Sequence, residues 1–242
     1  FTLPIEVVHV DGRARIPAIA EPLPPAAAIP DRHLPFREVI EAGGARPVEE
    51  HGILIGEVHG LEVCRVVDDP VTGDARLEVG VGAHDRETFQ MLHGDRPTVE
   101  ALADVVRSVT EHRSIGAPQH PLNLLAASRL LRSRLIERPE FLLAESVRAV
   151  EPPVPRANVK DQTPCVALAT IRAADGGPSM DVPVVCTTGI DLEVVPWATD
   201  VARVYGGDRV WIAAAARDVI DIQERLAALA RVPILFRPIA SH

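Results

Sequence analysis

Two glutamates, Glu62 and Glu78, are the residues whose type and spacing best fit a chemical role. Each lies in a segment of alternating apolar and polar residues, 61–67 and 75–81, and a stretch rich in turn formers separates the two segments. Carboxylates on neighbouring strands of such a hairpin can hold Mg²⁺ together with water and substrate phosphates, and the metal then activates a water molecule. We therefore predict a Mg²⁺ or Mn²⁺ site in which Glu62 and Glu78 are both metal ligands and catalytic residues.

Four further residues lie close enough in the sequence to join this site. Glu57 and His59 precede the first segment, whereas His84 and Asp85 follow the second. We predict His84 as a catalytic acid or base and Asp85 as a further metal ligand. The alternative is that Asp85 caps a helix that starts here, because a carboxylate is stabilised at a helix N-terminus.

The glycine–x–acid–apolar–x–arginine order at 60–65, followed by a loop and by apolar–glutamate–apolar at 77–79, resembles the core motif of the restriction-endonuclease-like, or PD-(D/E)xK, nucleases. The resemblance implies a helix, a strand hairpin with two acids, a second helix and further strands. It also implies that Glu62 and Glu78 stand for the two metal-binding acids. The first acid is usually Asp in that family, and Gly80 stands where the family has a lysine that helps to position the attacking water. An active metal-dependent phosphodiesterase and a degenerate, non-cleaving relative both fit this pattern.

Strand periodicity explains the same two glutamates without any chemistry. A strand with one buried face needs polar residues at alternate positions, and Glu62 and Glu78 would then be solvent-facing. We favour this interpretation, under which the chain is non-catalytic and acts through protein partners or self-association.

Composition excludes several classes of protein. The net charge of -9 disfavours a broad electrostatic contact with nucleic acid, although a local basic groove is compatible with it. Aromatic residues make up 3% of the chain, which leaves few platforms for stacking bases. No run approaches the ~18 apolar residues of a membrane-spanning helix, so we expect a soluble protein without a membrane contact. The 3 cysteines form no C-x-x-C motif, which fits a reducing, cytoplasmic location without zinc or disulfides.

Lys160 is the only lysine of the chain. The preference for arginine is typical of a GC-rich genome, here taken as bacterial. Lys160 lies in the predicted loop 156–161, where a reactive lysine and an ordinary solvated lysine are both open. The chain begins at Phe1 without an initiator Met, and a piece of a longer protein would explain this.

Periodicity predicts the elements that would position these residues. In the first half these are a helix over 36–42, strands over 52–59, 61–67 and 75–81, and helices that start near His84, at Thr98 and at Ala126. The last of these helices carries four arginines on one face: Arg129, Arg132, Arg134 and Arg138. We interpret that face as solvated, with nucleic-acid binding as the alternative.

The second half alternates apolar strands with amphipathic helices. It comprises a hairpin of 165–172 and 182–186, a helix near Asp191, a strand over 210–213, a helix capped by Asp218 and a strand over 233–236. This alternation is typical of a sheet covered on both faces. The predicted fold is therefore α/β, with a mixed sheet, two β-hairpins flanked by helices and a helical segment between the hairpins.

Two parts of the chain differ in composition. Residues 1–35 are rich in proline and predict an extended N-terminal arm, whereas residues 36–242 predict the α/β domain. Within this domain we expect a helical segment over 97–150 and a sub-boundary near 151–163. The arm either lies along the surface as a tether or docks on a second subunit, which would make the protein an oligomer.

Overall fold

The computed structural model describes the chain apart from residues 1, 3–5, 20, 26, 94–97, 119, 156–162, 174–176 and 241–242, and gives the backbone alone for 89–93. Lys160 and the whole of its predicted loop, 156–161, thus lie outside the described residues. The strands are β1 (Val8–Asp11), β2 (Ala14–Pro17), β3 (Arg46–Glu50), β4 (Ile53–Val58), β5 (Leu61–Asp68), β6 (Ala75–Val79), β7 (Ser146–Val150), β8 (Cys165–Ile171), β9 (Met180–Cys186), β10 (Val210–Ala215) and β11 (Ile234–Ile239). The α-helices are α1 (Phe36–Ala42), α2 (Gly82–His93), α3 (Thr98–Arg113), α4 (Ala127–Glu137), α5 (Val194–Tyr205) and α6 (Asp221–Ala227).

The first sheet is antiparallel, with the strand order β3-β4-β5-β6. Apolar residues of β4 and β5 meet α1 and α3 in one core cluster that includes Ile40, Leu54, Val63 and Leu102. Helix α2 packs against β5 and β6. Leu102 and Val109 form part of the buried face of α3, at 0% and 3% exposed.

The second sheet is mixed, with the order β7-β8-β9-β10-β11. Strands β7, β8 and β9 are antiparallel neighbours, whereas β9, β10 and β11 run parallel. Neighbouring residues of a strand belong to two different core clusters, as Val184 and Val185 illustrate. The cluster of Val184 contains Leu135 of α4, and the cluster of Val185 contains Val195 and Val201 of α5. The sheet is therefore covered on both faces, by α4 on one side and by α5 and α6 on the other.

The predicted α/β class is confirmed, and helices do lie between the two hairpins. The predicted helical segment 97–150 extends too far, because its residues 146–150 form strand β7. The hairpins β5–β6 and β8–β9 lie in two different sheets, however, and not in one mixed sheet. The helical stretch α2–α4 separates the two sheets along the chain, whereas residues 151–163 connect β7 to β8 within the second sheet. Asp218 accepts a hydrogen bond from the backbone of Gly189 at 2.9 Å and does not cap α6, which begins at Asp221.

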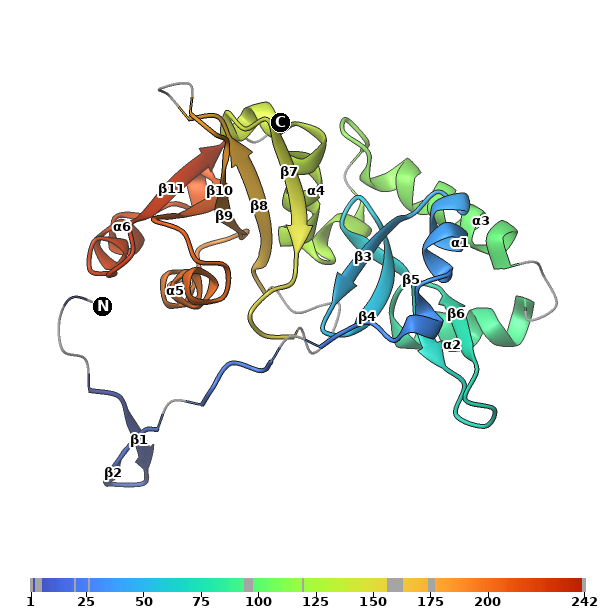
Figure 1. Ribbon diagram of the computed structural model, residues 1–242, viewed down its shortest axis with the longest axis horizontal. Helices are drawn as coiled ribbons and strands as arrows, with labels where there is room; N and C mark the ends of the chain where they lie inside the picture. The colour runs from blue at the N-terminus through green and yellow to red at the C-terminus, as the bar shows by residue number, and fades with distance from the viewer. Residues whose placement is uncertain are drawn as a thin grey trace.

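The N-terminal arm contains a short antiparallel hairpin, β1–β2, which Figure 1 shows apart from both sheets. Every residue from 9 to 19 is exposed. The arm contacts the body on both sides of this hairpin. The backbone N–H of Thr2 donates to the carbonyl of Leu229 at 2.7 Å. A Cβ placed on Gly52 would lie 3.0 Å from the Cβ of Ala27. No helix in the described part of the chain is long and apolar enough to cross a membrane.

Candidate functional site

The two predicted carboxylates are brought together around an arginine of α2. Arg86 lies with its Nη1 3.2 Å from Oε1 of Glu62 and its Nε 3.6 Å from Oε2 of Glu78. Each glutamate has a second arginine as well: Arg65 Nε lies 2.7 Å from Glu62, and Arg76 Nη2 lies 2.8 Å from Glu78. Glu62 is only 5% exposed, so its interpretation as a solvent-facing strand residue is wrong.

This arrangement does not fit a Mg²⁺ or Mn²⁺ site. Permanently charged guanidinium groups occupy the positions next to both carboxylates, where a hard cation would need oxygen ligands. Among the described residues there is no group of three or more His, Cys, Asp or Glu side chains that could hold a metal ion. Gly80 has φ +136°, and a Cβ there would lie 2.9 Å from the backbone nitrogen of Arg86. The close contact with α2 thus explains why no lysine stands at this position.

The other two predicted site residues lie at the start of α2. Asp85 lies in the first turn of α2, which begins at Gly82, so it is not the cap residue given above as the alternative. Its carboxylate accepts a hydrogen bond from the backbone N–H of Val81, just before the helix, at 2.6 Å. His84 is exposed, and its carbonyl oxygen accepts a hydrogen bond from the hydroxyl of Thr88 at 2.9 Å.

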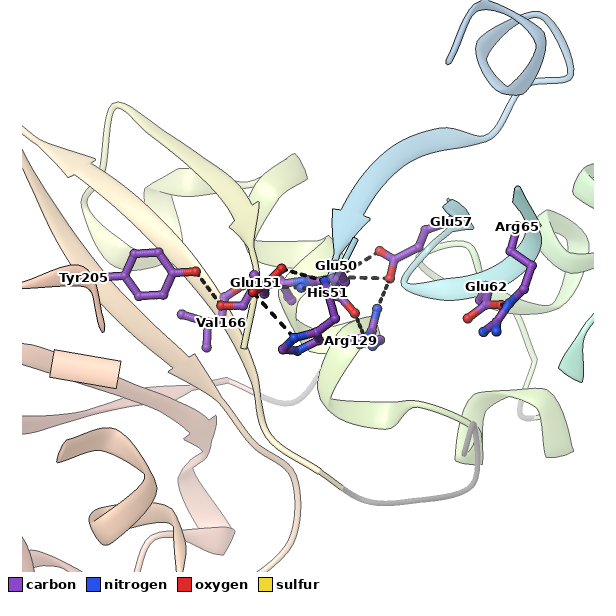
Figure 2. Close-up of polar contacts among 10 residues, drawn as sticks. Glu50, His51, Glu57, Glu62, Arg65, Arg129, Glu151, Val166 and Tyr205 are labelled. Carbon is purple, nitrogen blue, oxygen red and sulfur yellow. Dashed lines mark hydrogen bonds and ion pairs between the residues drawn. The ribbon is translucent and has the colours of Figure 1, made fainter. Parts of the chain in front are cut away.

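A charge cluster that the sequence did not reveal joins the two sheets through α4. It consists of Glu50 of β3, Glu57 of β4 and Arg129 and Arg132 of α4, and we call it the α4 cluster. Arg129 pairs with both glutamates, as Figure 2 shows. Arg132 lies 3.0 Å from both carboxylate oxygens of Glu57 and donates to the carbonyl of Val166 in β8 at 3.3 Å. One helix therefore connects β3 and β4 of the first sheet to β8 of the second.

The interpretation of this arginine face as solvated is wrong, because Arg129 and Arg132 are 4% and 0% exposed. Burial by itself raises the pKa of Glu57, but the guanidinium groups of Arg132 and Arg129 outweigh burial and hold that pKa at about 2. Glu57 therefore stays charged near neutral pH. A buried cluster of this kind fixes one arrangement of its elements, because any other arrangement would leave a buried charge without its partner.

A second polar connection between the sheets follows β3. His51 donates its backbone N–H to Oε2 of Glu151 at 2.6 Å, and its Nδ1 lies 3.5 Å from the other oxygen of that carboxylate. The hydroxyl of Tyr205 in α5 donates to the backbone carbonyl of Glu151. Figure 2 shows His51, Glu151 and Tyr205 next to the α4 cluster, on the side of the second sheet. Burial raises the pKa of Tyr205 to about 12, so its hydroxyl stays protonated.

The turn between β4 and β5 borders a small polar cavity of about 170 Å³. His59 lines this cavity, and its Nδ1 lies 3.1 Å from Oε1 of Glu137. The same oxygen accepts a hydrogen bond from the hydroxyl of Ser133 at 3.2 Å. His59 has a φ of +44°, a conformation that non-glycine residues rarely adopt. Arg113 stabilises it by donating to the His59 carbonyl oxygen from Nη2 at 3.0 Å and from Nε at 3.3 Å.

A larger groove of about 520 Å³ lies between β3 and β7, the neighbouring edge strands of the two sheets. We call it the interstrand groove. Tyr205, three arginines (Arg37, Arg46 and Arg148) and two glutamates (Glu49 and Glu151) are among the residues that line it. Arg46 and Ile136 also line the smaller cavity, so the two hollows adjoin.

The sequence contained only partial signals for these features. Glu57 and His59 were singled out as neighbours of a metal site, but they belong instead to the α4 cluster and to the small cavity. Comparison with protein-family models, with curated proteins and with solved structures finds no match to this chain.

Proposed function

We propose that this chain self-associates, and that the hairpin β1–β2 is the element that binds a second copy. The exposure of the hairpin carries the proposal: no residue from 9 to 19 is covered by the described part of its own chain. A hairpin of two strands is marginally stable in water and gains stability when it packs against a further surface.

Apolar side chains and open strand edges make the hairpin suited to this role. Val10 and Ile16 are 62% and 49% exposed, and Ile19 beyond β2 is 92% exposed. Within the described part of the chain, the outer edges of both strands carry backbone N–H and C=O groups without a strand partner, and such edges pair readily with another strand.

The tether favours a second copy as the partner. Four prolines, Pro22, Pro24, Pro25 and Pro30, bias the segment behind the hairpin towards extended conformations. Ten extended residues reach about 30 Å, which is enough to cross to a neighbouring molecule. Each body also presents an edge strand that can accept a strand from outside, β11 of the second sheet. Reciprocal exchange of two arms would give a closed, two-fold dimer.

Light scattering coupled to gel filtration tests the proposal. We expect a dimer mass for the full chain and a monomer mass after deletion of residues 6–19 or after the double substitution V10S/I16S. Val71→Ser is the matched control, because Val71 is 91% exposed in the turn between β5 and β6, and this variant should stay dimeric. A full chain that is monomeric over a wide concentration series, or a deletion that leaves the mass unchanged, would overturn self-association through the arm.

The metal-dependent nuclease implied by the resemblance stays a prediction. Its support is that Glu62 and Glu78 converge, although they do so on Arg86. Calorimetric titration with Mn²⁺ tests this prediction. Heat of binding in the wild type that is abolished in Glu78→Ala would support a metal site, whereas flat traces for both proteins would reject it.

A further inference from the structure

We propose that the interstrand groove binds a mononucleotide, with its phosphate on the groove arginines and its base near Tyr205. Its volume of about 520 Å³ lies within the range of roughly 300–1,000 Å³ typical of small-molecule sites. This proposal is independent of the arm, because the groove is formed mainly by the body of one chain.

The arginines provide a binding site for phosphate. Arg46 is exposed and has no ion-pair partner within the described parts of the chain. Arg37 pairs with Glu49, and Arg148 lies 3.1 Å from Asp181, but the side chains of both arginines are at least 40% exposed. Exposed ion pairs contribute little to stability, so a phosphate can replace either carboxylate at small cost. Guanidinium groups bind two oxygens of a phosphate at once, which favours phosphate over monatomic anions.

Tyr205 provides the aromatic surface for a base. It is the only tyrosine of the chain, and its hydroxyl is held by the backbone carbonyl of Glu151, which restricts the orientation of the ring. Val48, Val147 and Val150 add apolar surface to the same groove. Aromatic side chains stack on any of the bases, so we expect little preference among them from this contact alone.

The strands themselves provide hydrogen-bonding groups. Because β3 and β7 are edge strands of their sheets, the backbone groups on their outer edges have no partner strand in the described part of the chain. Such groups can donate to and accept from the polar edge of a base. Phosphate, aromatic ring and polar edge are all recognised within one groove, and a mononucleotide combines these three features.

Isothermal titration calorimetry of the full chain with AMP, GMP, CMP and UMP tests the proposal, with adenosine and inorganic phosphate as partial ligands. We expect binding of at least one mononucleotide, at least tenfold tighter than adenosine or phosphate. Arg46→Gln and Tyr205→Leu should each weaken that binding about tenfold or more. Arg107→Gln is the matched control: Arg107 lies on α3, its side chain is 75% exposed, and its variant should bind like the wild type.

Three outcomes would overturn the proposal. The first is the absence of binding by all four mononucleotides to the folded wild-type chain. The second is phosphate binding as tight as that of the nucleotides, because the aromatic surface would then have no role. The third is unchanged nucleotide affinity in Arg46→Gln, provided that circular dichroism shows each variant to be folded.

Discussion

The α4 cluster and the interstrand groove are both rich in arginine and both lie where the two sheets meet, yet their arginines have opposite surroundings. Arg132 is fully buried and contacts Glu50, Glu57 and the carbonyl of Val166. Arg46 is exposed at the groove and has no ion-pair partner in the described part of the chain. A buried guanidinium held by carboxylates therefore fixes the arrangement of the elements, whereas an exposed one remains available to a ligand.

Removal of a cluster arginine should have the largest effect on stability. Arg132→Ala leaves Glu57 and Glu50 buried with one cation fewer, and we expect a loss of about 3–5 kcal/mol in the free energy of unfolding. Arg148→Gln in the groove should change it by less than about 0.5 kcal/mol, because its ion pair is exposed. Urea denaturation of both variants measures this contrast. Equal losses of unfolding free energy in the two variants would show that Arg132 contributes no more to stability than the exposed Arg148.

Acid should weaken the cluster through Glu57. The pKa of this carboxyl is lowered from 4.5 to about 2 in the folded chain, so its contribution to stability is present above pH 4.5 and is lost as the pH falls towards 2. The size of the contribution is about 3 kcal/mol. We expect the free energy of unfolding to fall more steeply between pH 4.5 and 2 in the wild type than in Glu57→Gln. Parallel curves for the two proteins would contradict this assignment.

A smaller effect is expected at the turn beneath α4. A Cβ on Gly60 would lie 2.2 Å from the carbonyl oxygen of Arg129, and the residue has a φ of +75°. Gly73 has a similar φ of +74° but nothing within 4 Å of its Cβ position. Both alanine variants bear the cost of a left-handed backbone, but only Gly60→Ala also places a Cβ against the carbonyl of Arg129. Gly60→Ala should therefore be less stable than Gly73→Ala by about 2 kcal/mol. Thermal unfolding of the two variants measures this difference. Similar losses of stability in both would mean that α4 lies farther from the turn than described here.

Much of the fold could be predicted because its signals are local. Helix α1 begins at Phe36 and ends at Ala42 as expected, and the alternating segments that became β4, β5 and β6 were recognised together with their turn residues. Strands β3 and β7 were missed. Pro47 and two consecutive glutamates interrupt the apolar pattern of β3, which is common in edge strands. The residues of β7 were included in the predicted helical segment 97–150. These missed strands line the groove.

The site was harder to predict because its partners are distant in sequence. The arginines of α4 have the same spacing on a buried face as they would have on a solvated one, and only Glu50 and Glu57 of the first sheet distinguish the two cases.

The α4 cluster makes the two sheets one cooperative body, and native-state hydrogen exchange tests this coupling most directly. We expect the core amides of β5 and β9 to exchange with the same opening free energy in the wild type, and Arg132→Met to change both by the same amount. Different opening free energies for the two strands in the wild type, or a change confined to one of them in Arg132→Met, would contradict the claim.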